Sequence, residues 1–290
     1  MASIGKYVQS FRLRTLPLSM SGIVLGSGLA FVSVESYLRF WVVFALAICT
    51  TLSLQILSNL SNELGDSQRG TDDNQQGRVA YGMQSGDISE KEMKNLIKIF
   101  VGLCIVFGTT LVWTAFGTLL SVESIVFLGL GLLAIVGAMT YTLGRHNYGY
   151  IGLGDLGVFI FFGLLSTMGS YYLQAKVMTA DVVWSAVAIA LPIVGVLNLN
   201  NIRDMDNDKA HEKRTFAGLL GKTGGKIYHA LLLTGCLLIF TLLGKYYTLL
   251  ALPVFVWHIY YVFTHQDSQL DKQMPVLMFT TLAVAIIAIF

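Results

Sequence analysis

The sequence predicts an all-α, polytopic membrane protein, a bundle of nine transmembrane helices with cytoplasmic cap loops. The first observation is composition: 54% of the 290 residues are hydrophobic and only 12% are charged, against about 25% charged in a soluble domain. The second is length, because the apolar residues come in runs of roughly 17 to 25, enough to cross a bilayer as helix. The third is the distribution of the basic residues along the chain.

The apolar runs define the predicted helices in order. Pro17, Pro192 and Pro253 fall inside them, where neighbouring helices can satisfy the freed backbone carbonyls. The nine predicted helices cover about residues 15–34, 38–62, 95–118, 122–143, 151–174, 180–200, 225–244, 247–264 and 274–290.

The basic residues predict the orientation. With the N-terminus in the cytoplasm, nine crossings place all but three of the 19 lysines and arginines on the cytoplasmic side, the exceptions being Arg39, Lys176 and Lys245. Cytoplasmic loops of membrane proteins carry such an excess of cations. The helix count and the orientation therefore support each other.

The chain is predicted to form a single domain over residues 1–290. Two cytoplasmic connections, about 67–94 and 201–224, are too short for cores of their own and longer than ordinary turns. We expect both loops to cap a site at the membrane surface.

The polar run that follows the sixth apolar segment has a regular spacing. Asn200, Asp204, Asp208 and Glu212 recur at intervals of four, which places neighbouring side chains on one face of a helix. A charged helix end is commonly only solvated, so this strip alone does not identify a site.

A second stretch repeats the spacing. Asn62 and Asp66 lie 138 residues before Asn200 and Asp204, at the end of the second predicted helix. Four helices separate the equivalent points, so both stretches emerge on the same side. Two acidic motifs are therefore predicted to face each other at one mouth of the bundle.

The chemistry of these motifs favours magnesium and a diphosphate. Carboxylate and amide oxygens are hard ligands that suit Mg²⁺, and neighbouring histidines and cysteines that would indicate zinc or copper are scarce. Basic side chains interleaved with the acids can neutralise phosphate. They are Arg69, Arg78, Arg203, Lys209, Lys213 and Arg214.

An apolar bundle below a diphosphate site suggests a lipid diphosphate as substrate. Loss of an allylic diphosphate leaves a carbocation that aromatic faces can stabilise, and Phe159, Phe161 and Phe162 lie in the fifth helix. Asp155 lies just inside the same helix, and an acid at membrane depth is functional by default.

Other motifs carry no function. Gly221-Lys222-Thr223 resembles the end of a P-loop, but Phe216 stands where its first glycine would have to be. Cys49, Cys104 and Cys236 lie singly in apolar segments and predict neither a disulfide framework nor a thiolate metal site.

These features resemble the UbiA superfamily of intramembrane aromatic prenyltransferases, which has nine helices and two aspartate-rich motifs after the second and sixth. The similarity is strongest to the menaquinone branch, the 1,4-dihydroxy-2-naphthoate polyprenyltransferases. The matching segments are Arg14-Thr15-Leu16-Pro17, residues 54–62, Gly65-Asp66, Arg69-Gly70-Thr71-Asp72, Tyr141-Thr142-Leu143-Gly144, residues 150–155, Phe159 to Gly163, residues 200–204 and Lys213-Arg214-Thr215. Three positions depart from the branch: Glu63-Leu64 replaces Asp-Tyr, Arg145 replaces a proline and Glu212 replaces a third aspartate.

The resemblance implies transfer of a polyprenyl group from its diphosphate to 1,4-dihydroxy-2-naphthoate, giving demethylmenaquinone, diphosphate and carbon dioxide. It implies Mg²⁺ as cofactor, a multi-pass protein of the bacterial inner membrane with a cytoplasmic active site, no nucleic-acid partner and no obligate protein partner. Tyr141 and Asp155 become candidates at the aromatic acceptor. The implied metal ligands are Asp66, Asp72, Asp204, Asp208 and Glu212, and the implied diphosphate contacts are Asn62, Asn200, Arg69, Arg78, Lys209, Lys213 and Arg214.

Two alternatives stay open. A sister enzyme of the superfamily would use another acceptor, namely 4-hydroxybenzoate, homogentisate, chlorophyllide or haem. A transporter would place its ionisable residues near the bilayer midplane, whereas the acids here gather at one surface.

Overall fold

A computed structural model describes residues 4–34, 36–70, 81–145 and 147–290. Within this part of the chain, nine helices are long and apolar enough to cross a membrane, which confirms the predicted fold class. The spans are Ile4–Ser33, Tyr37–Arg69, Glu90–Phe116, Val122–Thr140, Gly154–Ala175, Ala180–Ala210, Phe216–Leu242, Tyr246–Thr264 and Asp267–Ile287.

Several spans consist of more than one helical element. The fifth span is divided into α6 (Gly154–Val158), a π-helix η4 (Phe159–Leu165) and α7 (Ser166–Ala175). The other helices are α1 (Ile4–Ser10), α2 (Leu16–Ala30), α3 (Tyr37–Arg69), α4 (Glu90–Phe116), α5 (Val122–Thr140), α8 (Ala180–Ala210), α9 (Phe216–Leu242), α10 (Leu252–Thr264) and α11 (Gln273–Ile287). Short 3₁₀ turns are η1 (Leu13–Thr15), η2 (Phe31–Ser33), η3 (Tyr148–Tyr150), η5 (Tyr246–Ala251) and η6 (Asp267–Lys272).

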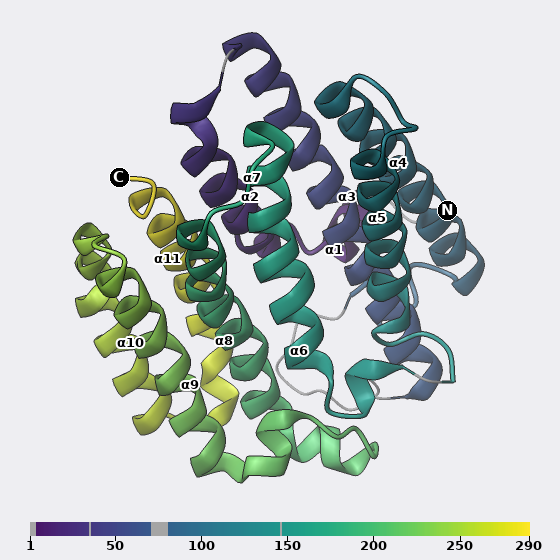
Figure 1. Ribbon diagram of the computed structural model, residues 1–290. Helices are drawn as coiled ribbons and strands as arrows, with labels where there is room; N and C mark the ends of the chain where they lie inside the picture. Colours follow the sequence, from purple (N-terminus) through teal and green to yellow (C-terminus); the bar gives the residue numbers. More distant parts are fainter. Residues whose placement is uncertain (1–3, 35, 71–80, 146) are drawn as a thin grey trace.

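The helices form two groups with α2 and α7 between them (Figure 1). Helices α3, α4 and α5 pack on one side, and α8 to α11 pack on the other. Each group has its own apolar core, around Leu60 and Met93 in the first and around Ile193 and Phe240 in the second. The two groups are therefore packed around separate cores.

Small residues allow α2 and α7 to pack closely. A Cβ atom at Gly22 would lie 1.9 Å from Ser166 Oγ, and one at Gly26 would lie 2.1 Å from the Thr167 carbonyl oxygen. Pairs of small residues four apart permit such close approach of membrane helices. These two glycines therefore fix the distance between the central helices.

Two helices continue past their predicted ends. Helix α3 extends to Arg69, where Gly70 closes it in the left-handed conformation, and α8 extends to Ala210. The prediction of a cap loop over 201–224 is wrong, because this segment is mostly the end of α8 and the start of α9. Hydropathy marks the end of the apolar core and not the end of the helix, so it does not predict the polar final turns of α3 and α8.

Only three of the four residues in the predicted strip lie on the helix. Asn200, Asp204 and Asp208 lie in α8, whereas Glu212 follows the helix end with a φ of 56° and an exposed side chain. The helical face that carries the first three residues therefore does not include Glu212.

Two of the three cations predicted to lie apart from the rest do meet at the end of the bundle opposite the motifs. Arg39 donates a 2.5 Å hydrogen bond to the Ala115 carbonyl, and Lys176 Nζ lies 3.8 Å from the centre of the Phe116 ring. Burial and then the charge of Arg39 lower the pKa of Lys176 to about 8. This end is the beginning of α3 and the end of α4 and α7.

Candidate functional site

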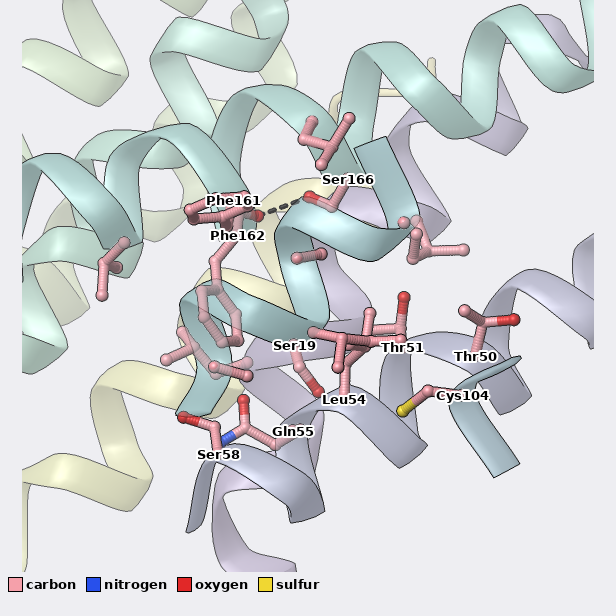
Figure 2. A pocket seen from close by; sticks show the side chains of 18 of the residues that line it. Ser19, Thr50, Thr51, Leu54, Gln55, Ser58, Cys104, Phe161, Phe162 and Ser166 are labelled. Atoms are coloured by element: carbon pink, nitrogen blue, oxygen red, sulfur yellow. Dashed lines mark hydrogen bonds between the residues drawn. The ribbon is translucent and has the colours of Figure 1, made fainter. Parts of the chain in front are cut away.

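A largely apolar cavity of about 520 Å³ lies between the two helix groups. Its walls come from α2, α3, α4, α5, η4 and α8, and it reaches from the aliphatic middle of the bundle to the end where the two motifs lie. Figure 2 shows Phe161 and Phe162 on one side of it, facing Ser19, Leu54 and Gln55 on the other. Its shape suits a long apolar ligand with a polar head.

Both motifs reach this cavity through their asparagines. Asn62 of α3 and Asn200 of α8 line it, together with Tyr141, which follows α5. These three positions were predicted from the sequence, and the structure brings them to one cavity. Its polar end thus lies at the repeated motif.

The π-helix in the fifth span directs aromatic side chains into the cavity. Phe161 and Phe162 line it, whereas Phe159 does not. Gly163 lets α8 approach η4, because a Cβ there would lie 2.2 Å from the Ala190 Cβ. The Ser166 hydroxyl hydrogen-bonds the Phe162 carbonyl within the widened turn. Such π-bulges often occur at functional sites.

Tyr150 connects the two acidic motifs. Its hydroxyl donates a 2.8 Å hydrogen bond to Asp66 Oδ1. The Arg69 guanidinium lies 4.4 Å from the centre of its ring, and Lys213 Nζ lies 5.6 Å from it. Lys213 also forms a 3.2 Å ion pair with Asp208. Residues from α3, η3 and the end of α8 therefore meet around one aromatic ring.

The backbone holds this arrangement in place. The Arg214 amide donates a 3.0 Å hydrogen bond to the Tyr150 carbonyl, which pairs the segments around 151 and 214 as a short parallel bridge. The Lys213 amide bonds the Asp208 carbonyl at 2.8 Å. Arg69 donates to the Gly144 carbonyl at 2.7 Å.

Lys213 is a largely covered cation, with 12% of its side chain exposed. Burial lowers the pKa of Lys213, but the nearby charges of Asp208 and Asp66 more than offset this effect and raise it above the ordinary value of lysine. A charged amine is therefore maintained between the two motifs, where an anionic group would benefit from it.

A second cluster surrounds Asp204. Arg203 donates from Nε to Asp204 Oδ1 at 2.7 Å and from Nη2 to Oδ2 at 2.9 Å. The same guanidinium hydrogen-bonds Asn200 Oδ1 at 2.5 Å and pairs with Asp271 of η6. Asp271 also accepts a 3.3 Å hydrogen bond from Arg14, a cavity-lining residue.

The two acceptor candidates are in different surroundings. Tyr141 lines the cavity, its ring lies 5.3 Å from that of Tyr148 in an edge-on arrangement, and burial raises the pKa of its phenol well above the ordinary value. Asp155 is buried with its carboxyl hydrogen-bonded by Tyr228, and it does not line the cavity. The geometry therefore brings Tyr141, and not Asp155, to the cavity wall.

The remaining predicted residues are peripheral or outside the described part. Lys209, Glu212 and Arg214 have exposed side chains. Asp72 and Arg78 lie outside the described residues.

The donor chemistry fits a hard divalent cation. Asp66, Asp204 and Asp208 present carboxylate oxygens, and each is held by a hydroxyl or a basic side chain that an ion could replace. Among the residues that the structure describes, no three acidic, histidine or cysteine side chains meet as a ready-made metal group.

Sequence reasoning missed several residues of this region. Tyr150 begins the segment 150–155, which resembles the family, but its contacts depend on how η3 lies between the ends of α3 and α8. Asp271 is a lone acid before the last apolar run, so its spacing gave no signal. Arg12 and Arg14 line the cavity, and Tyr81, which accepts a 3.0 Å hydrogen bond from Arg14, lines it too.

Comparisons with known proteins agree with this geometry. The model of the UbiA prenyltransferase family matches residues 19–283. The 1,4-dihydroxy-2-naphthoate octaprenyltransferase of Escherichia coli K12 is 40% identical over 275 residues, covering 90% of this chain and 86% of that protein. The protein of the same name from Haemophilus influenzae is 37% identical, covering 89% and 86%.

Solved structures share the fold at low identity. A UbiA homologue from Aeropyrum pernix K1 superposes with a TM-score of 0.66 at 17% identity, covering 93% of this chain and 97% of that one. A UbiA homologue from Archaeoglobus fulgidus, bound to GPP and Mg²⁺, superposes with a TM-score of 0.62 at 12% identity, covering 98% and 99%.

Proposed function

Because the chain belongs to the UbiA prenyltransferase family, we propose that it transfers a polyprenyl group from polyprenyl diphosphate to 1,4-dihydroxy-2-naphthoate. The products are the prenylated dihydroxynaphthalene, which is the reduced (quinol) form of demethylmenaquinone, together with diphosphate and carbon dioxide. The observation that carries this proposal is that the asparagines of both repeated Asn-x-x-x-Asp motifs line one apolar cavity. The chain is also 40% identical to a naphthoate octaprenyltransferase over 90% of its length.

The two ends of the cavity suit the two parts of a prenyl diphosphate. The aliphatic part, lined by side chains such as Leu54, Leu128 and Ile135, would hold the prenyl chain. The diphosphate would lie at the end of the cavity that Asn62, Asn200 and Arg14 line, toward Lys213 and Arg69. Burial strengthens such charge-assisted contacts because water screens them less.

Magnesium fits beside Asp66, Asp204 and Asp208, and Asp72 is a further candidate ligand. A structural neighbour with 12% identity was solved with GPP and Mg²⁺, which supports divalent metal use here. When bound, the metal would neutralise the diphosphate and favour its departure. Arg203 and Lys213, which pair with Asp204 and Asp208 in the structure, would then turn toward phosphate oxygens.

The reaction breaks the carbon–oxygen bond of the diphosphate and forms a carbon–carbon bond to the naphthoate ring. Phe161 and Phe162 would shield the allylic cation from water and stabilise it through their ring faces. The neutral phenol of Tyr141 can hydrogen-bond the acceptor, whose carboxyl group leaves as carbon dioxide. Asp155, buried against Tyr228, is proposed to hold this wall of the site in position.

The chain is proposed to be one transmembrane domain of the bacterial inner membrane, with the N-terminus and the motif end in the cytoplasm. The excess of lysine and arginine at the motif end supports this orientation. Labelling of single cysteines placed near Lys91 and near Lys245, by a reagent that does not cross the membrane, tests it.

The test of the reaction uses membranes that contain the protein, octaprenyl diphosphate and each of four acceptors. We expect a decarboxylated prenyl product from 1,4-dihydroxy-2-naphthoate in Mg²⁺ and none after chelation by EDTA. A product only from 4-hydroxybenzoate, homogentisate or a porphyrin acceptor would overturn the acceptor assignment, and activity that persists in EDTA would overturn the metal assignment.

A further inference from the structure

Arg203 joins two carboxylates that come from different helices. Both oxygens of Asp204 in α8 accept hydrogen bonds from its guanidinium, and the carboxylate of Asp271 in η6 pairs with its Nη1. The side chains of Arg203 and Asp204 are 9% and 7% exposed, whereas that of Asp271 is 41% exposed. The buried Arg203–Asp204 pair is thus also in contact with a more exposed carboxylate, that of Asp271.

This arrangement conflicts with metal binding at Asp204. A divalent cation placed against Asp204 would lie within a few ångströms of the guanidinium, and like charges at such distance repel strongly in a site of low dielectric. The guanidinium has to withdraw from Asp204 when the metal arrives. Withdrawal of a buried cation from a carboxylate is costly unless another carboxylate stays in contact with it.

Asp271 supplies that second carboxylate. It contacts Arg203 through the Nη1 atom, on the part of the guanidinium that does not contact Asp204. It also accepts a hydrogen bond from Arg14, which lines the cavity and donates to Tyr81. One carboxylate from the start of the last span therefore holds both Arg203 and the cavity-lining Arg14.

The position of Asp271 is set from both sides. Asp267, one turn earlier in η6, pairs with Lys222 at 2.9 Å and with Lys226 at 3.6 Å. Gln273, two residues later, accepts a 3.1 Å hydrogen bond from His258 in the core. Asp271 thus presents its carboxylate from a fixed segment.

We propose that Asp271 is a positioning residue that retains Arg203 when Asp204 exchanges the guanidinium for a divalent cation, and that it thereby sets the metal affinity of the site. The proposal rests on the proposed function, because that function supplies the metal at Asp204. Diphosphate contributes to the exchange by accepting part of the arginine charge.

The test measures Mn²⁺ binding by the purified full-length protein in detergent, in the presence of inorganic diphosphate, by electron paramagnetic resonance. Asp271→Asn is expected to weaken Mn²⁺ binding about tenfold, and Asp271→Glu is expected to restore it to within about threefold. Asp87→Asn is the matched control, because it removes a carboxylate of similar exposure that pairs with Lys6 and not with Arg203, and its affinity should stay within about twofold of the original protein.

A double-mutant cycle separates this role from a merely structural one. In an Arg203→Gln background the guanidinium that needs retaining is absent, so Asp271→Asn should change Mn²⁺ affinity by less than about twofold. An unchanged affinity in Asp271→Asn, an equal loss in both backgrounds, or an original protein that binds no Mn²⁺ with diphosphate would each overturn the proposal. The acceptor assay judges the reaction separately, because it measures product from the original protein alone.

Discussion

The Tyr150 hydroxyl donates a 2.8 Å hydrogen bond to Asp66 Oδ1, and this bond joins the connection after α5 to the end of α3. The same ring lies beside Arg69 and Lys213. One tyrosine thus orients a candidate metal ligand and contacts a cation from each of two motifs.

Tyr150→Phe should lower kcat/KM for the prenyl diphosphate about tenfold, because Asp66 loses a hydrogen bond in a half-buried site. The ring stays in place, so the protein should keep its thermal stability in detergent. Steady-state kinetics in membranes measure the effect. Tyr7→Phe removes a hydroxyl that bonds Glu92 at 3.0 Å away from the cavity, and it serves as the control. Equal kinetics of the two variants would contradict a role for Tyr150.

Asp208 and Asp206 are neighbours in α8 that face different surroundings. Asp208 is buried and pairs with Lys213, whose side chain is only 12% exposed, whereas Asp206 is exposed and pairs with Lys222. Asp208→Asn should therefore reduce product formation at least about a hundredfold, because it removes a candidate metal ligand and leaves the Lys213 charge uncompensated. Asp206→Asn should stay within about twofold. Product assays on membranes with matched protein amounts compare them, and similar losses in both variants would contradict the assignment.

The difference between Asp208 and Asp206 shows which features of the fold and the site can be predicted from the sequence. The nine spans and the pairing of Asn62 with Asn200 follow from hydropathy and from the spacing of four, because both depend on local periodicity. Asp208 and Asp206 differ in the face of the helix that carries them, and the residue selected by the spacing of four, Asp208, is the buried one.

The rest depends on contacts between distant segments. Tyr150, Asp271 and Arg14 reach the site because η3, η6 and η1 fold against the ends of α3 and α8, and no local pattern encodes those approaches. Glu212 continues the spacing of four but not the helix, since the chain turns at this residue with a positive φ. Periodicity predicts a face only as far as the helix extends.

Gly131 lines the part of the cavity that is proposed to hold the prenyl chain. It lines the cavity from α5, a Cβ there would meet nothing within 4 Å, and it lies ten residues, or roughly 15 Å of helix, from Tyr141. Gly131→Phe should therefore reduce turnover of octaprenyl diphosphate about tenfold while retaining turnover of geranyl diphosphate, because only the long chain reaches that depth. Competition between the two diphosphates measures this ratio.

Gly129 is the matched control for this experiment. It lies two residues earlier in α5, also has open space around it, and does not line the cavity. Gly129→Phe should leave the ratio of the two substrates unchanged. If both variants shift the ratio equally, the cavity does not hold the chain at this level.

A buried chain of hydrogen bonds links the helices of the second group. Asn198 Nδ2 lies 3.4 Å from His229 Nδ1, His229 Nε2 lies 3.0 Å from His258 Nε2, and His258 Nδ1 lies 3.1 Å from Gln273 Oε1. Because the glutamine oxygen only accepts, His258 donates to it, and each earlier group then donates to the next. This direction requires both imidazoles to be neutral.

His258→Leu should lower the free energy of unfolding by about 1–3 kcal/mol, because it leaves the His229 donor buried without an acceptor. His229→Leu together with His258→Leu should cost less than the sum of the single changes, since the second change removes the unsatisfied donor. Unfolding in detergent with increasing denaturant measures all three variants. His265→Leu, at a partly exposed ring stacked on Tyr261, should change stability by less than about 0.5 kcal/mol. Additive losses in the double variant would show that the two histidines stabilise the bundle independently and that the chain of donors does not act as a unit.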